Sequence, residues 1–185
     1  AFQLKYAAFG YGLPFDAGFG ADEKNASQNI LSVGQGGITL GQKEYYIDTD
    51  EATTNIREAY KRFIIKMFAI CGLEKEAQQA MRDIMKIETT LAKASKSRTE
   101  LRDVEANYNK TAMADFDRLY PNLPLHRIFL AEGVKEDCLQ TVVVGQPQFM
   151  AEADQLFASL NADELRHYMQ WNVMLGAANY LSDDV

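Results

Sequence analysis

Apolar residues recur every three or four positions after Asp50, which predicts an amphipathic helix with one buried face. Asp50 suits the N-cap of that helix, and Gly72 suits its end. The apolar positions of this face are Ile56, Tyr60, Phe63, Ile64, Met67 and Ile70. A second periodic stretch follows at Ala77, Met81, Ile84, Ile87 and Leu91. Two long helices joined by so short a turn are expected to pack antiparallel.

The middle of the chain is less regular. Residues 93–109 are polar and predict a loop or a short extended connection. A helical pattern returns after Thr111, fades at Pro121 and Pro124, and resumes weakly over residues 126–130. The β-branched, apolar run Leu139–Val144 predicts a strand.

Two helices are expected at the C-terminal end. Pro147 suits the first position of one of them, which has an apolar stripe. Asn161 and Glu164 have the spacing of a capping box and predict the start of the last helix. The stripe of the first helix is Met150, Ala153, Leu156, Phe157 and Leu160, and the inner face of the second is Tyr168, Trp171, Leu175 and Ala178.

The first fifty residues are rich in glycine and aromatic residues, so we interpret them as an irregular segment anchored on a core by its rings. Within it, the apolar runs 28–33 and 44–47 predict a small β-hairpin or two edge strands. The expected fold is therefore mainly α: a helical lobe with antiparallel long helices plus that hairpin or those strands. Residues 1–50 would dock on the lobe formed by residues 51–185, giving one structural domain overall.

Composition narrows the classes of function. With 47% hydrophobic residues, the 185-residue chain can build a packed core. Its net charge of −7 argues against a nucleic-acid partner and against an anionic membrane surface. No apolar run is long enough for a membrane span. The chain begins with Ala1 and lacks the pattern of a signal peptide, so we expect a processed or excised piece.

The two cysteines, Cys71 and Cys138, lie in apolar sequence and are expected to be buried free thiols, although a single bridge stays open. The tyrosines at positions 45, 46, 60, 108 and 168 lie beside apolar stripes, which favours core packing. Asn25 and Asn109 each begin a glycosylation acceptor triplet, a pattern that also occurs often by chance.

Few residues could carry catalysis. The chain has two histidines, His126 and His167, and lacks the His-Glu-x-x-His motif, in which two imidazoles on one helix bind zinc. Glu164 and His167 are three residues apart on one side of a helix, a spacing some metal sites use, but no second pair supplies further ligands. We interpret them as a capping glutamate beside a surface histidine. A small enzyme built on this pair is the weakest of our hypotheses.

Other catalytic motifs are missing or incomplete. Gly-x-Ser-x-Gly is absent, and neither cysteine has a basic neighbour in sequence. The segment 18–22 resembles the start of a dinucleotide fingerprint but lacks the third glycine, so we interpret it as a turn. Gly34, Gly36 and Gly37 lack the Lys-Ser/Thr of a phosphate loop, and hairpin geometry explains them. The sequence predicts no catalytic, cofactor-binding or metal-ligating residue.

A series of short segments occurs in a distinctive order along nearly the whole chain. The segments are Gln35-Gly36-Gly37-Ile38 with Leu40, Glu44-Tyr45-Tyr46, Tyr60, Glu88 with Leu91-Ala92, Arg102-Asp103, Tyr108-Asn109-Lys110-Thr111, Val142-Val143-Val144, Tyr168 with Trp171, and Leu181-Ser182. They resemble the N-terminal, non-catalytic region of the neprilysin and endothelin-converting enzyme family of zinc endopeptidases, which has bacterial PepO-like members. The chain departs from the family at Ile38, Thr39, Gly41 and Lys43, where leucine, glycine, proline and arginine are usual.

The resemblance implies that two mostly helical lobes enclose a chamber and that this chain is most of the lobe facing the zinc lobe. That wall would restrict entry to short, flexible oligopeptides. Zinc, its ligands and the substrate-binding strand are expected in the catalytic lobe of the same parent polypeptide, where a glutamate would act as general base and cleavage would precede hydrophobic residues.

The chain alone is therefore expected to be inactive. The resemblance also suggests a cell-envelope location, periplasmic or extracellular. An alternative from another class is a self-standing helical peptide-binding or adaptor module.

Overall fold

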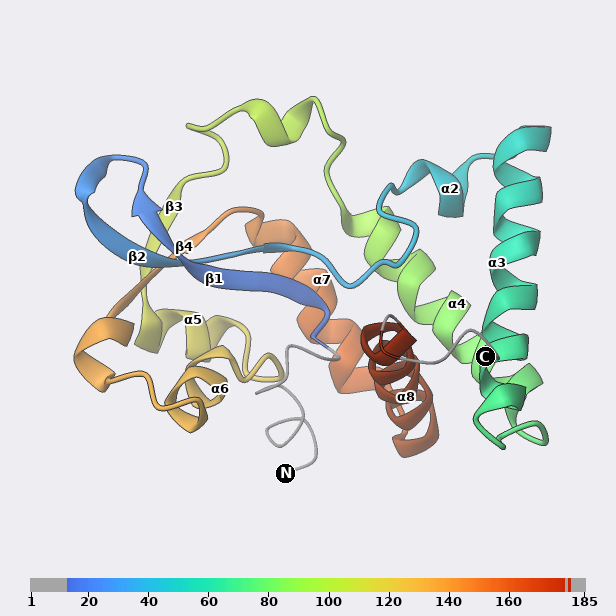
Figure 1. The fold of residues 1–185 in the computed structure, drawn as a ribbon. Helices are drawn as coiled ribbons and strands as arrows, with labels where there is room; N and C mark the ends of the chain where they lie inside the picture. The colour runs from blue at the N-terminus through green and yellow to red at the C-terminus, as the bar shows by residue number, and fades with distance from the viewer. Residues whose placement is uncertain (1–12, 179, 181–185) are drawn as a thin grey trace.

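The structure is a computed structural model that describes residues 13–178 and residue 180. A small sheet lies at one end of the molecule and two long helices lie at the other, with α7 (Pro147–Ser159) and α8 (Ala162–Ala178) between them (Figure 1). The expected fold class is confirmed, because the described chain is mainly helical with short strands. Gly10, Gly12 and Leu181-Ser182 lie outside the described residues.

The sheet has four strands in the order β1-β2-β4-β3. Strands β1 (Phe15–Asp22) and β2 (Asn25–Gln35) form an antiparallel hairpin. Strand β2 also pairs in parallel with β4 (Thr141–Val144), and β3 (Asn109–Ala112) pairs antiparallel with β4. Residues of the first fifty therefore share one sheet with a segment about 110 positions later in the chain.

The hairpin differs from the one expected from the sequence. Residues 44–47 do not pair with residues 28–33: Glu44–Ile47 is the short helix α2. The true partner, β1, contains Gly18 and Gly20, so the segment interpreted as a turn is extended strand. An added Cβ at either glycine would meet nothing within 4 Å, so neither position requires glycine for space.

Helices α3 (Glu51–Ile70) and α4 (Ala77–Ala94) run antiparallel, as the periodicity predicts (Figure 1). Asp50 is confirmed as the N-cap of α3, since its Oδ1 accepts the Thr53 N–H at 3.0 Å. Gly72 follows the end of α3 with a φ of +77°, a left-handed conformation that costs a glycine little.

The remaining elements lie near their predicted positions. Residues 95–108 hold only the 3₁₀ turn Glu100–Arg102. Helices α5 (Met113–Leu119) and α6 (Leu125–Ala131) flank the two prolines, and a 3₁₀ turn at Glu136–Leu139 precedes β4. Helix α7 (Pro147–Ser159) begins at its proline.

The capping box of α8 (Ala162–Ala178) is also confirmed. Asn161 Oδ1 accepts the Glu164 N–H at 3.0 Å, and Glu164 Oε2 accepts the Asn161 N–H at 2.9 Å. Two orphan amides at the start of the helix are thus satisfied reciprocally.

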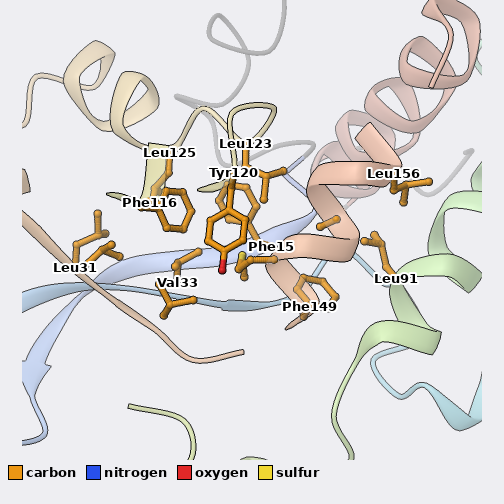
Figure 2. Packing of buried hydrophobic residues seen from close by; sticks show 14 of the residues in the cluster. Phe15, Leu31, Val33, Leu91, Phe116, Tyr120, Leu123, Leu125, Phe149 and Leu156 are labelled. Carbon is orange, nitrogen blue, oxygen red and sulfur yellow. The ribbon is translucent and has the colours of Figure 1, made fainter. Parts of the chain in front are cut away.

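The core has two clusters of buried apolar residues. One lies between the sheet and helices α5, α6 and α7, where Phe15, Leu31, Val33, Phe116 and Phe149 converge (Figure 2). The other lies among α2, α3, α4 and α8 and includes Tyr46, Tyr60, Ile64, Phe68 and Trp171. Helix α4 belongs to both clusters and connects the two ends of the fold.

Two predictions about burial are wrong. Ile56, Phe63 and Ile70 are about 40% exposed, because they form one edge of the α3 stripe and only Tyr60, Ile64, Met67 and Phe68 reach the core. Cys71 and Cys138 are free thiols, but they are exposed. Cys71 follows the last residue of α3, and Cys138 lies within the 3₁₀ turn Glu136–Leu139. None of the helices in the described part of the chain is both long and apolar enough to span a membrane.

Candidate functional site

The segment after β2 is held by a close approach of backbone to backbone. A Cβ on Gly36 would lie 2.7 Å from the backbone N of Asp16. Gly37 has a φ of +72°, and a Cβ there would lie 2.8 Å from Cα of Pro14 and 2.7 Å from Oη of Tyr168. Hairpin geometry, the explanation expected from the sequence, is wrong for these two glycines, which lie beyond the strand. Only glycine fits, because neither neighbouring backbone can move away cheaply.

Side chains clamp the same segment from three directions. Gln146 Oε1 accepts the Gln35 N–H at 2.8 Å, while Gln146 Nε2 donates to Asn107 Oδ1 at 3.0 Å. The Gln35 amide in turn donates to the Lys96 carbonyl and accepts the Lys96 N–H. Tyr168 Oη donates to the Gly37 carbonyl at 2.9 Å. Residues 35–37 therefore join β2, the 95–108 segment and α8.

A buried carboxylate organises the next stretch of chain. We call Thr39, Tyr46, Tyr60, Glu88 and Trp171 the Glu88 network. Glu88 is 1% exposed; its Oε2 accepts the hydroxyls of Tyr46 at 2.7 Å and Tyr60 at 2.8 Å, and its Oε1 accepts Thr39 Oγ1 at 2.7 Å. Trp171 Nε1 donates to Tyr60 Oη and to Thr39 Oγ1. One side chain of α4 thus ties together α2, α3, α8 and the loop before α2.

The electrostatics of the Glu88 network favour a structural role. Burial raises the pKa of Glu88, and the three hydrogen bonds it accepts oppose that rise only in part. Burial and the nearby Glu88 also raise the pKa of both Tyr46 and Tyr60, so their hydroxyls remain donors. No buried side-chain nitrogen or oxygen among the described residues lacks a hydrogen-bond partner. The site therefore fixes geometry and offers no free base or nucleophile.

A second carboxylate joins the hairpin to β3. Asp22 is 2% exposed and accepts the Tyr108 hydroxyl at 2.7 Å, the Lys24 N–H at 2.9 Å and Lys110 Nζ at 3.0 Å. These donors, led by the Tyr108 hydroxyl, lower the pKa of Asp22 to about 2. The Lys24 ammonium lies 4.7 Å from the centre of the Tyr108 ring. Tyr108 and Lys110 of the family-like segment thus connect β3 to the β1–β2 hairpin through Asp22.

Glu164 and His167 do not form a shared site. Glu164 caps α8 and pairs with Lys86. His167 is 2% exposed, so its prediction as a surface histidine is wrong; its Nδ1 lies 2.7 Å from Asp83 Oδ2 and its Nε2 lies 3.3 Å from Glu76 Oε2. The two side chains have separate partners on α4 or just before it, which leaves them no shared ligand position.

The other histidine lies near the surface between two carboxylates. His126 Nδ1 is 3.0 Å from Asp117 Oδ2, and its Nε2 is 3.1 Å from Glu136 Oε1. Across residues 13–178 and 180, no group of three or more His, Cys, Asp or Glu side chains is placed to hold a metal ion. The described residues therefore do not fit a zinc site.

Sequence reasoning missed several of the residues that build these contacts. Asp83 lies on the apolar face of α4, and a charge at a core position is itself a signal of a buried partner. Thr39 is a departure from the family pattern, yet it supplies a hydroxyl to the Glu88 network. Gln146 and Asp22 were missed because the partners that reveal their roles, Gln35 and Tyr108, lie 111 and 86 positions away.

Comparison with known proteins identifies the family. The sequence of residues 2–185 matches the family model Peptidase_M13_N, described as "Peptidase family M13". The chain belongs to this family. It is 28% identical to rat "Endothelin-converting enzyme-like 1" and 27% identical to rat "Endothelin-converting enzyme 1", each over 167 residues and 87% of the chain. The chain spans only about a fifth of these M13 relatives, 21% and 22% of their lengths.

Solved structures share the fold of this M13 chain. A zinc metalloprotease Zmp1 of Mycobacterium tuberculosis in complex with an inhibitor superposes with a TM-score of 0.89 at 23% identity, covering 98% of this chain and 28% of that one. PepO of Lactobacillus rhamnosis gives a TM-score of 0.80 at 22% identity, covering 98% and 29%. The resemblance read from the sequence is confirmed, and most of the residues that carried it are now assigned to packing or hydrogen bonding.

Proposed function

We propose that this chain is the non-catalytic lobe of a zinc metalloendopeptidase and forms part of the wall of its substrate chamber. The observation that supports this most is that the M13 match extends over residues 2–185 while the described residues offer no fitting metal site. Residues that carry the resemblance, such as Gly37, Tyr60 and Glu88, take part in close packing and buried hydrogen bonds. Such contacts would keep the wall of a chamber rigid.

The chamber would select substrates by size. A short, flexible peptide can enter an enclosed space, whereas a folded protein cannot thread into it. The two-cluster core, linked by α4 and the Glu88 network, gives the wall stiffness without any catalytic group. The partner would be a catalytic lobe in the same parent polypeptide, and zinc would be bound there. We also propose, from the family alone, a location in the cell envelope or outside the cell.

The first experiment determines the native coding sequence that follows Val185. We expect the reading frame to continue into a His-Glu-x-x-His motif, and an in-frame stop soon after Val185 would refute the proposal. The purified 185-residue chain should bind no stoichiometric zinc and cleave no peptide. The parent should do both and lose activity to a chelator.

A second experiment addresses size selection separately. The parent would be given one cleavable sequence of about ten residues, first as a free peptide and then inside a long unfolded protein and inside a folded loop. We expect the free peptide to be cleaved and the folded loop to be spared. Equal cleavage of all three substrates would remove the size-restricting role while leaving the lobe assignment intact.

A second candidate function, a self-standing peptide-binding module, has one observation in its favour. A hollow of about 420 Å³ lies over the β1–β2 face beneath the 101–108 segment, with Ile30, Val33, Leu101 and Val104 among its lining. Extended peptides can bind beside such sheets. Saturable binding of peptides by the chain alone, without a catalytic lobe in its gene, would favour this function over the first.

A further inference from the structure

A groove between α3 and α4 gathers positive charge in an otherwise acidic chain. We call it the α3–α4 groove; its volume is about 540 Å³. Its lining consists of Arg57, Lys61, Met81, Arg82, Met85, Lys86, Thr89, Thr90 and Lys93. Among the residues that the structure describes, no carboxylate lines it, although the chain as a whole has a net charge of −7. Helix α3, which supplies one wall of the groove, lies at the end of the molecule away from the sheet (Figure 1).

The cationic residues of the lining come from both helices, and Arg57 donates to the backbone carbonyls of Tyr45 and Asp48. Lys86 and Lys61 each pair with a glutamate outside the lining, Glu164 and Glu58. Arg82 donates to the neutral Gln79 side chain, and no carboxylate among the described residues pairs with Lys93. Lys61 and Lys86 are thus neutralised locally, whereas Arg82 and Lys93 keep positive charge that no carboxylate among the described residues offsets. An anionic partner could pair with these two cations.

The shape of the charge pattern limits the kind of anion. From Arg82 to Lys93, α4 advances by roughly 16 Å at about 1.5 Å per residue. A single inorganic anion is too small to contact cations spread over that length. An extended polypeptide covers the same distance with about five residues at roughly 3.3 Å each. The pattern therefore suits an elongated polyanion.

The floor of the groove distinguishes a peptide from a polyphosphate. The partly buried Met81 and the buried Met85 lie between the cationic positions, and the hydroxyl-bearing Thr89 and Thr90 lie beside them. Methionine side chains form an adaptable apolar surface that suits aliphatic side chains and Cα atoms. A polyphosphate has nothing apolar to place there. The mixture of cations, hydroxyls and thioethers matches the chemistry of an acidic peptide.

We propose that the α3–α4 groove binds an acidic polypeptide segment in an extended conformation. This interaction surface is independent of the chamber role, since it needs neither zinc nor a catalytic lobe. Because the whole chain carries net negative charge, an acidic peptide is repelled overall and can bind only where the local charge is positive. Binding would therefore be localised and sensitive to salt.

The test measures binding of fluorescein-labelled hexaglutamate to the 185-residue chain by anisotropy, with labelled hexaglutamine as the neutral probe. The groove variant is Arg82→Glu/Lys93→Glu. The matched control is Arg62→Glu/Lys66→Glu, since both of those residues are exposed, lie on α3 and are outside the groove lining. Both double variants change the net charge equally. A milder pair, Arg82→Gln/Lys93→Gln, serves in case charge reversal disturbs folding.

We expect saturable, salt-sensitive binding of hexaglutamate and none of hexaglutamine. The groove reversal should weaken it by at least about tenfold, equivalent to ~1.4 kcal/mol, and the neutralised pair by less, whereas the control pair should change it under threefold. Equal losses in groove and control variants, or no saturable binding, would overturn the proposal. Tighter binding of tripolyphosphate, or retention by phosphatidylserine vesicles but not by the peptide, would overturn the assignment to a polypeptide.

Discussion

Replacing Glu88 with alanine is the sharpest test of the Glu88 network. The carboxylate is 1% exposed and accepts the hydroxyls of Thr39, Tyr46 and Tyr60. In Glu88→Ala, the two buried phenols lose their acceptor, and each unsatisfied buried group costs about 1–3 kcal/mol. We expect the free energy of unfolding to fall by about 4 kcal/mol.

Two further variants separate hydrogen bonding from charge. Glu88→Gln keeps the shape, and its carbonyl can accept both phenols while its amide donates to Thr39 Oγ1. We therefore expect a loss of only about 1 kcal/mol at neutral pH. Glu152→Ala is the matched control, because Glu152 is an exposed glutamate within α7, and it should change stability by less than about 0.5 kcal/mol.

Chemical and thermal unfolding provide the measurements. For a chain of this length, each kcal/mol corresponds to roughly 2–4 °C, so Glu88→Ala should lower Tm by roughly 8–16 °C. Urea titration monitored by circular dichroism would give the free energies. A loss below about 1 kcal/mol for Glu88→Ala, or equal losses for the alanine and glutamine variants, would refute the reasoning.

The pH dependence of the same variants tests the buried charge. Burial raises the folded-state pKa of Glu88 above its ordinary value of 4.5. The stability contribution of this group is therefore fully present below that value and is lost as pH rises through the folded-state pKa. Relative to the wild type, Glu88→Gln should gain stability as the pH rises above 4.5. A difference between the two proteins that stays constant with pH would contradict this assignment.

Other predictions follow from the glycines, Asp22 and the thiols. Gly37→Ala should cost about 3 kcal/mol or more in urea titration, whereas Gly41→Ala, with the same φ of +72° but open space, should cost only about 1 kcal/mol; equal costs would contradict the close approach. The pKa of Asp22 is about 2, so its contribution is present above its ordinary value of 3.8 and is lost as pH falls toward 2; Asp22→Asn should flatten that acid-side fall. Cys71 and Cys138 should both react with Ellman's reagent in the folded chain, and reaction only after denaturation would refute their exposure.

Local signals were read correctly from the sequence where the information lies within a few residues. Asp50 caps α3 through an amide three positions later, and Asn161 with Glu164 caps α8 across the same spacing. Pro147 begins α7 because its missing N–H is not needed there. Such contacts depend on sequence neighbours alone, so a single sequence is enough to predict them.

Signals that depend on distant partners were missed. Strand β1 does alternate apolar residues with glycine and aspartate, but Gly18 and Gly20 also suit a turn, and pairing with β2 reveals the strand. Its apolar positions are Phe15, Ala17, Phe19 and Ala21. The four residues of α2 are too few for periodicity, and Tyr46 is fixed there by its bond to Glu88. His167 seemed superficial because its partner, Asp83, comes from another helix.

Burial at the edges of helix faces was also hard to predict. Ile56, Phe63 and Ile70 recur every seven positions, so they continue the apolar stripe of α3 in sequence. Helices α4 and α8 cover only the centre of that stripe, which leaves these three side chains about 40% exposed. The neighbouring helices determine how wide a face of α3 is covered, so the sequence of α3 alone does not predict that width.

The parallel pairing of β2 with β4 affects the order in which the chain can fold. The register joins Leu31 to Val142, so closing this part of the sheet brings together segments separated by about 110 residues. During synthesis, residues 15–35 leave the ribosome long before β4, so a β1–β2 hairpin formed at that stage has one edge of β2 unpaired. Such an edge is a template to which strands of other molecules can add until Thr141–Val144 covers it.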